Sequence, residues 1–139
     1  MSDRPSPRAI QRLAALALLV PDYDAALAYY TGVLGFDLVQ DADMGGGKRF
    51  VVVAPPGGSG ASLVLARAVT PEQVSRIGDQ TGGRVFLFLH TDDFARDFAA
   101  YRSRGVAFRE SPREEPYGTV AVFSDLFGNL WDLIQPRPA

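Results

Sequence analysis

The same order of apolar and polar positions occurs twice along the chain. Residues 16–36 consist of an apolar run, an acidic turn and a segment whose apolar residues recur at helical spacing up to Gly35. Residues 87–106 repeat this layout at an offset of 71 (91 − 20), which aligns Val20 with Thr91. A short apolar run bounded by turn residues indicates a buried strand, and apolar residues three and four apart indicate a helix with one buried face. The pattern therefore predicts a strand followed by a helix in each half.

Further apolar runs predict the remaining elements. In the first half we expect strands at 13–20, 36–41, 49–58 and 61–66, with a turn at Pro55–Gly60 into the last of them, and a helix that Asp22 or Asp24 caps and Gly35 ends. In the second half we expect strands at 84–90, 106–110, 119–129 and 130–135, a helix from Asp92 or Asp93 to Gly105, and a polar loop at 112–117. Between the halves, Thr70-Pro71-Glu72 predicts a short capped helix.

These elements predict an α+β fold of two tandem β-α-β-β-β modules whose sheets enclose a cavity. At 139 residues the chain has the usual length of one domain. We expect a loose tail at 1–10 and a single domain at 11–139. The domain would consist of module one (11–68), a connector (69–83) and module two (84–135).

Composition narrows the classes of function. The net charge is −2 and no basic cluster is interleaved with aromatic residues, which argues against nucleic acid as a partner. No apolar stretch approaches the roughly 20 residues that a membrane span needs. The first residues lack the apolar core of a signal peptide, so we expect a cytoplasmic protein. The chain has no cysteine, which excludes disulfides and thiolate sites, and one histidine, His90.

Three segments, in order along the chain, resemble the vicinal oxygen chelate (VOC) superfamily of glyoxalase I, extradiol dioxygenases and bleomycin-resistance proteins. They are VPDYDAALAYYTGVLGF (20–36), TDDFARDFAAYRSRGV (91–106) and FSDLFGNLWDL (123–133). The resemblance covers about residues 13–135 and implies the two-module fold and a homodimer. Because the superfamily hosts lyases, epimerases, oxygenases and drug-binding proteins, it implies a small organic ligand without fixing a reaction.

The resemblance also implies where a divalent metal would be held. Catalytic members of the superfamily use side chains on the first and last strand of each module. Matched residue by residue, these positions fall at Ala15, Val64, Phe86 and Asp132. Of the four, only Asp132 has a side chain that can coordinate a metal. We therefore expect no metal of the usual kind and no cofactor, and the Lewis-acid chemistry of the superfamily would be lost with it.

Two titratable residues remain as catalytic candidates. His90 shares a strand face with Phe88, so its imidazole can point into the cavity and act as a general base or a hydrogen-bond donor. Alternatively, it only bonds a neighbouring backbone group at the end of the strand. Asp132 shares a face with Leu130 and Ile134, which would bury a carboxylate among apolar neighbours. Asp132 either anchors or deprotonates a ligand, or it forms a salt bridge with an arginine such as Arg84 or Arg49.

Other residues are assigned by position. Trp131 points to the opposite face from Asp132 and is expected to pack beneath a helix. Tyr117 and Glu115 lie on a loop that either overhangs the cavity or is merely solvated. The expected cavity lining is Ala15, Val64, Phe86, Phe88, His90, Leu130 and Asp132.

Three functions fit this cavity. The first is a metal-free protein that binds a small organic molecule, as bleomycin-resistance proteins do. The second is a lyase, isomerase or oxygenase that uses His90 and Asp132, or an unusual metal site. The third is a regulatory or structural dimer whose cavity is filled by Phe86 and Phe88.

Overall fold

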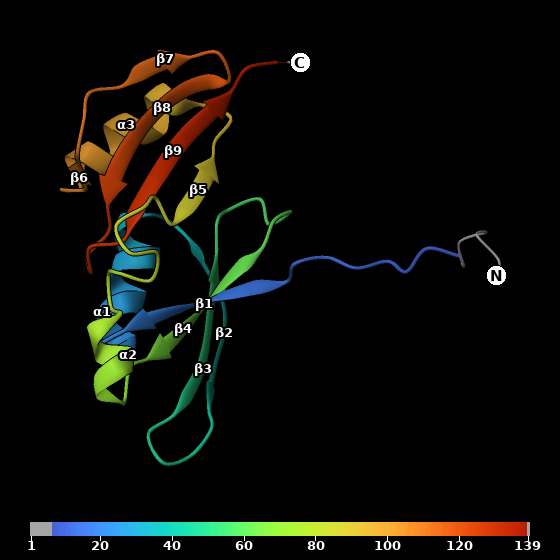
Figure 1. Cartoon of the computed structure of the whole chain (residues 1–139), viewed down its shortest axis with the longest axis vertical. Coiled ribbons are helices and arrows are strands. Elements are labelled where there is room, and N and C mark those ends of the chain that lie inside the picture. Colours follow the sequence, from blue (N-terminus) through green and yellow to red (C-terminus); the bar gives the residue numbers. More distant parts are fainter. Residues whose placement is uncertain (1–6, 139) are drawn as a thin grey trace.

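The computed structural model describes residues 7–138 and contains two sheets, one from each half of the chain (Figure 1). The first half forms β1 (Ala15–Val20), α1 (Tyr23–Leu27), η1 (Ala28–Val33), β2 (Asp37–Asp43), β3 (Arg49–Ala54) and β4 (Ser62–Arg67). Its strands lie in the order β1-β4-β3-β2, with β1 parallel to β4 and the other neighbours antiparallel. The connector contains α2 (Pro71–Ser75).

The second half repeats this arrangement. It forms β5 (Leu87–His90), α3 (Phe94–Ser103), β6 (Ala107–Phe108), β7 (Arg113–Glu115), β8 (Gly118–Ser124) and β9 (Leu130–Pro136). Its sheet has the order β5-β9-β8-β6, with β7 also paired to β8. β5 is parallel to β9, as β1 is to β4. The predicted α+β class and duplicated module are confirmed.

Local signals in the sequence account for the helices. The side chain of Asp22 accepts a hydrogen bond from Ala25 N and caps α1, and Asp93 caps α3 in the same way through Arg96 N. Thr70 and Gln73 form a reciprocal capping box on α2. The helix after Asp22 continues as the π-helical turn η1, and Gly35 follows it with φ +74°, the left-handed conformation that glycine adopts without strain.

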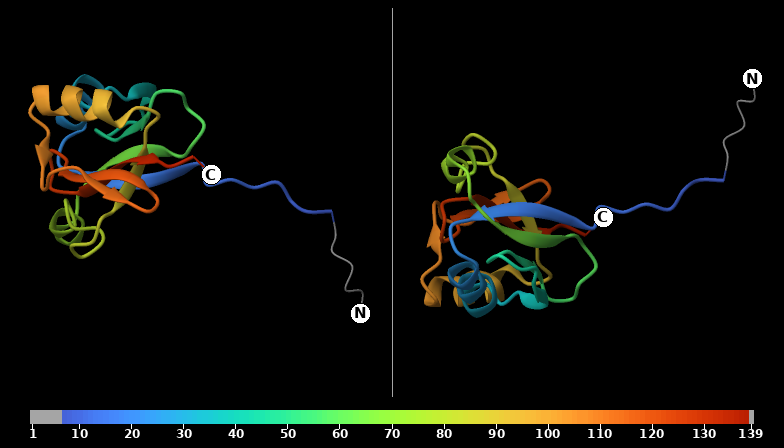
Figure 2. Two further views of the ribbon diagram at one scale, coloured as in Figure 1. Left: turned by 90° about the horizontal axis from the view of Figure 1, so that it is seen from above. Right: turned by 90° about the horizontal axis from the view of Figure 1, so that it is seen from below.

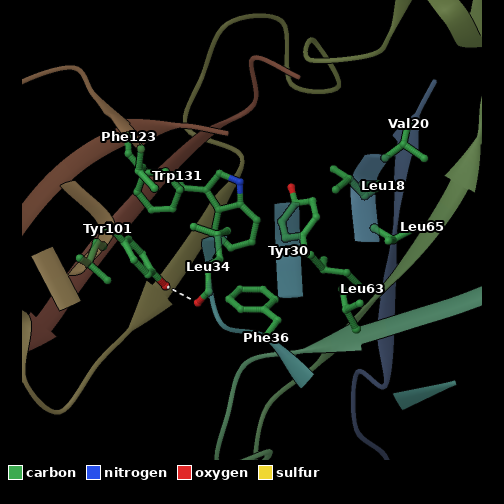
Figure 3. Close-up of a cluster of buried hydrophobic side chains, with 14 of the residues drawn as sticks. Leu18, Val20, Tyr30, Leu34, Phe36, Leu63, Leu65, Tyr101, Phe123 and Trp131 are labelled. Carbon is green, nitrogen blue, oxygen red and sulfur yellow. Dashed lines mark hydrogen bonds between the residues drawn. The ribbon is translucent and has the colours of Figure 1, made fainter. Parts of the chain in front are cut away.

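One hydrophobic core joins the two modules. Tyr30 and Phe36 of the first module contact Trp131 of the second, with ring centroids 6.0 and 5.9 Å apart (Figure 3). The hydroxyl of Tyr101 on α3 donates to Leu34 O at 3.2 Å. Trp131 is buried beneath the helices, as expected. Seen from above and below, α3 lies beside α1 and η1 on one side of the strands and α2 on the other (Figure 2).

The structure corrects several predicted bounds. β1 begins at Ala15, and Leu13, expected in a buried strand, is 70% exposed on a segment at 7–14 that extends away from the rest of the chain (Figure 1). The loop expected at 112–117 contains the strand β7, whose charged residues pair with β8 at the sheet margin. β5 begins at Leu87 and β6 is two residues long. Residues 1–6 of the expected tail lie outside the described residues.

Candidate ligand-binding cleft

A cleft of about 990 Å³ lies between the two modules. Module one contributes apolar side chains of β1 and β4 and the residues after η1, and module two contributes β5, one face of α3 and Trp131. The apolar lining includes Leu16, Phe36, Leu63, Leu87, Leu89 and Trp131. Pockets for small organic ligands usually have about 300–1,000 Å³ and a mostly apolar lining with a few polar groups. The cleft has the size and the character of such a site.

The turn between β3 and β4 forms one wall of the cleft. Residues 55–61 (PPGGSGA) all line it. Gly57 and Gly58 adopt φ values of +90° and +54°, which bend the chain where side chains would be strained. The sequence predicted this segment as a turn, and its glycines indicated no more than that. Only the position of module two shows that the turn faces a cleft.

The polar wall of the cleft comes from the start of α3. Arg96 forms ion pairs with Asp92 (2.8 Å) and Asp97 (3.0 Å), and Thr91 Oγ1 donates to Asp97. Burial acts to raise the pKa of Asp97, but the hydrogen bonds from Arg96 and Thr91 outweigh it and lower the pKa below the usual value. With Arg104, which also lines the cleft and acts on Asp97, the wall holds two positive and two negative charges, so a neutral ligand suits it.

Two of the predicted cavity residues line this cleft. Phe88 is 63% exposed, and His90, at the end of β5, is also exposed. No hydrogen bond to the His90 imidazole occurs within residues 7–138, so the backbone partner considered for it is not present there. The cleft residues that the sequence did not indicate, such as Tyr101 and Arg104, belong to the helix, where the pattern of apolar residues indicated only core packing.

The remaining predicted lining residues lie elsewhere. Phe86 and Leu130 line a separate pocket of about 130 Å³ beside the connector. Ala15 is exposed and Val64 half-buried, and both lie on sheet faces away from the core side chains Leu18 and Leu65. The structure therefore divides the predicted set among the cleft, the small pocket and the open faces of the sheets.

Asp132 is buried on the open face of the second sheet, between Phe88 on β5 and Val122 on β8. Its Oδ1 atom has no hydrogen-bond partner within the described residues. Burial raises the pKa of Asp132, while the charge of Arg113 lowers it and that of Glu110 raises it further.

No arginine pairs with Asp132 in the described part of the chain. Arg49 instead binds Asp24 and Asp41 in module one, at 2.8 and 2.7 Å. Tyr117 and Glu115 lie at the edge of the second sheet, where Arg113 bonds the Tyr117 hydroxyl (3.4 Å) and the Glu115 carboxylate (3.3 Å).

The residues at the superfamily's metal positions do not fit a divalent ion. Ala15, Val64 and Phe86 carry no donor atom, and Asp132 stands alone among them. Within residues 7–138 no group of three or more histidine, cysteine, aspartate or glutamate side chains converges. A stable divalent site normally uses several such ligands.

Comparison with known proteins identifies the family. A family model described as Glyoxalase/Bleomycin resistance protein/Dioxygenase superfamily matches residues 12–133. The chain belongs to this superfamily. An uncharacterised protein from Shewanella frigidimarina (strain NCIMB 400) is 55% identical over 126 residues, which cover 90% of this chain and 93% of that protein. The VOC resemblance of the sequence is confirmed.

Two solved structures of similar proteins bear on function. TnmS3, an antibiotic-binding protein from Streptomyces sp. CB03234, is 35% identical, with a TM-score of 0.75 and coverage of 94% of this chain and 100% of that one. A superfamily member from Sphaerobacter thermophilus DSM 20745 is 29% identical, with a TM-score of 0.73 and coverage of 91% and 98%. Among the described residues, no helix is long and apolar enough to cross a membrane.

Proposed function

We propose that this VOC protein binds a small, largely apolar organic molecule in the cleft between its modules and does so without the superfamily's divalent metal. The cleft carries the proposal, because its volume of about 990 Å³ and its apolar lining match the needs of such a ligand. The similarity to the antibiotic-binding protein TnmS3 supports the same class of function. The loss of donor atoms at three of the four metal positions supports the metal-free part.

The lining favours an aromatic or polycyclic ligand without net charge. Phe36 and Trp131 contribute aromatic side chains to the lining, and Phe88 lines the cleft from the edge strand β5. Aromatic rings add stacking energy of about 0.5–1.5 kcal/mol per pair beyond the area they bury. Arg96, Asp92 and Asp97 pair with one another, so a charged ligand that binds any of these three groups would have to break an ion pair.

A pair of neighbouring alanines on α3 tests the site. Ala100 lines the cleft, whereas Ala99 is exposed outside it. In a thermal-shift and tryptophan-fluorescence screen of polycyclic aromatic antibiotics, we expect a saturable hit that Ala100→Phe weakens at least tenfold and Ala99→Phe leaves unchanged. Trp131 is the chain's one tryptophan, so its fluorescence reports on the cleft. Equal binding by both variants would place the ligand elsewhere and refute the proposed site.

Elemental analysis tests the metal-free part. We expect no stoichiometric nickel, zinc, manganese or iron after incubation with each ion and desalting. Retention of one ion per chain, abolished by Asp132→Ala, would overturn this part of the proposal.

An acid–base enzyme is the second candidate, favoured by the unpartnered Oδ1 of Asp132. His90 and Asp132 lie on the same face of the second sheet, because Phe88 pairs with Asp132 and His90 with Ile134. A buried carboxyl with a raised pKa and an imidazole on the same sheet face can exchange protons with a ligand bound on that face. This candidate requires turnover of a bound compound, lost in both Asp132→Asn and His90→Ala. Unaltered ligand recovered after long incubation would exclude it.

A homodimer remains part of the proposal. Apolar side chains on β2 and on the segment at 7–14 are left open to solvent, among them Val39 (58% exposed) and Ile10. A second copy could bury these side chains, and exposed apolar surface of this kind commonly marks such an interface. Light scattering during size-exclusion chromatography measures the mass. The cytoplasmic location stays a prediction.

A further inference from the structure

The backbone groups on the equivalent edge strand have hydrogen-bond partners in one module and not in the other. β1 and β5 occupy equivalent positions, each at the margin of its sheet and each parallel to the last strand of its module. At the offset of 71, Ala17 corresponds to Phe88 and Leu19 to His90. An edge strand exposes N–H and C=O groups that need partners. How each module satisfies its edge therefore bears on what the cleft can bind.

In module one the chain covers this edge itself. The side-chain amide of Gln80, in the connector, donates from Nε2 to Ala17 O (3.2 Å) and accepts at Oε1 from Leu19 N (2.8 Å). One carboxamide thus satisfies a carbonyl and an N–H group two residues apart. It does so by offering a donor and an acceptor side by side, as a neighbouring strand would.

In module two the equivalent atoms face the cleft. Thr91 N donates to Ile134 O of β9 at 2.8 Å. In a parallel pair, the backbone N–H and C=O groups of successive residues point alternately toward the neighbouring strand and away from it. Leu89 therefore faces β9, and the backbone groups of Phe88 and His90 face away from it. Within residues 7–138 no group bonds Phe88 O or His90 N, and residues 87–92 line the cleft.

We infer that the free edge of β5 recognises a primary carboxamide or lactam on the ligand, which donates to Phe88 O and accepts from His90 N as Gln80 does in module one. This inference rests on the proposed binding function and names the chemical class of its ligand. The donor and acceptor lie side by side in such a group, and the rest of the molecule occupies the apolar cleft beside Phe88. The His90 backbone, rather than its imidazole, makes the contact.

A strand of a second copy is the alternative occupant of this edge. Pairing of β5 with a second copy's β1 is disfavoured because Gln80 already binds the matching atoms of β1. Pairing between two copies of β5 stays open to test. It would protect the His90 amide from hydrogen exchange without ligand and in proportion to protein concentration.

Two isosteric probes test the inference. Naphthalene-2-carboxamide and 2-acetylnaphthalene differ by NH₂ in place of CH₃, so only the first offers a donor beside its carbonyl. We expect the carboxamide to bind about tenfold more tightly, equivalent to about 1.4 kcal/mol. We also expect the carboxamide to slow hydrogen exchange at the His90 amide, and to do so at lower concentration than the ketone. Equal affinities, or no slowing at His90, would overturn the inference.

Variants separate the backbone of His90 from its side chain. His90→Ala keeps the N–H group and should keep the tenfold preference. His90→Pro removes that N–H group, from which both probes accept through the carbonyl oxygen, and should weaken the binding of both. Proline is tolerated on the open side of an edge strand. Unchanged binding of both probes by His90→Pro would overturn the inference. If His90→Pro does not fold, hydrogen exchange at the His90 amide of the wild type still tests the contact with the ligand.

Failure of the inference can be told from failure of the proposed function. Equal binding of both probes, each weakened by Ala100→Phe, would overturn the carboxamide contact and leave the cleft as a binding site. If neither probe alters Trp131 fluorescence at millimolar concentration, both proposals fail for aromatic ligands. Protection of His90 that rises with protein concentration alone would assign the edge to a second copy and overturn the inference.

Discussion

Replacement of Asp125 by alanine should come close to unfolding the protein. Asp125 is 6% exposed, and its carboxylate accepts from Tyr30 Oη (2.5 Å), Trp131 Nε1 (3.1 Å), Phe127 N (3.0 Å), and both the backbone N (3.0 Å) and Nδ2 (2.9 Å) of Asn129. Tyr30 belongs to module one and the other donors to module two. This carboxylate therefore ties the modules together at the centre of the shared core.

The magnitude follows from the donors that alanine leaves behind. A buried donor without a partner costs about 1–3 kcal/mol. Five donor groups lose their acceptor, but they share it, so their costs do not simply add, and groups near the turn can reach water. We expect Asp125→Ala to lower the free energy of unfolding by about 3–5 kcal/mol. That is a large part of the 5–15 kcal/mol typical of a domain.

Tyr30→Phe separates one donor from the acceptor. It removes a single hydroxyl and leaves Asp125 its other partners, so we expect a loss of about 1–2 kcal/mol. Asp37→Ala is the control, because Asp37 is exposed and should change stability by less than about 0.5 kcal/mol.

Urea unfolding followed by the fluorescence of Trp131 measures all three variants. A loss below about 1 kcal/mol for Asp125→Ala would refute the reasoning, because the donors would then have found other partners. In a double-mutant cycle, Tyr30→Phe should cost less in the Asp125→Ala background than in the wild type. Additive losses would show that the two residues are not coupled.

Three further predictions concern other parts of the molecule. Gln80→Ala should lower the free energy of unfolding in urea by about 1–3 kcal/mol, because it leaves Ala17 O and Leu19 N on the edge of β1 without their partner. Gln40→Ala on the exposed strand β2 is the control and should have no effect, so equal losses would contradict the pairing. Burial raises the pKa values of Tyr30 and Tyr101, so the unfolded chain loses these protons at lower pH than the folded chain does. The free energy of unfolding should therefore fall as pH rises above about 10, by up to about 1.4 kcal/mol per pH unit for each tyrosine. A flat profile to pH 11 would contradict this. Burial likewise raises the pKa of Asp132, so the folded state holds that proton more tightly, and the stability from this group should grow as pH falls through the range just above 4. The difference in free energy of unfolding between wild type and Asp132→Asn should therefore change with pH in that range, and a constant difference would refute this.

The sequence predicted those parts of the fold that depend on local signals. The caps found at Asp22 and Asp93 are each one of two alternatives that the sequence left open, and the cap at Thr70 and the left-handed turn at Gly35 were expected as found. They involve residues a few positions apart, so spacing alone reveals them. The strand β7 was missed because its charged residues Arg113–Glu115 show no alternation of apolar and polar positions, and only pairing with β8 makes them a strand.

The candidate site depends on contacts that spacing does not encode. Asp125 fell within the segment 119–129 expected as a strand, with no sign of its role, and its partner Tyr30 lies 95 positions earlier. The cleft brings a turn of module one against the edge strand and helix of module two. The expected cavity was placed between the inner faces of the sheets, from the alternation along each strand. That alternation gives a side chain's face but not the position of one sheet relative to the other.

Duplication of the module gives this protein two equivalent strand edges, and the connector distinguishes them. It leaves β4, the neighbour of β1, and runs toward module two, so Gln80 can reach the edge of β1 on the way. Gly78 fixes its course, because a Cβ atom there would lie 2.1 Å from Phe127 O. Within the described residues no side chain bonds Phe88 O or His90 N on the corresponding edge of β5. The same β-α-β-β-β unit thus forms a closed edge in one half and an open edge, facing an apolar cleft, in the other.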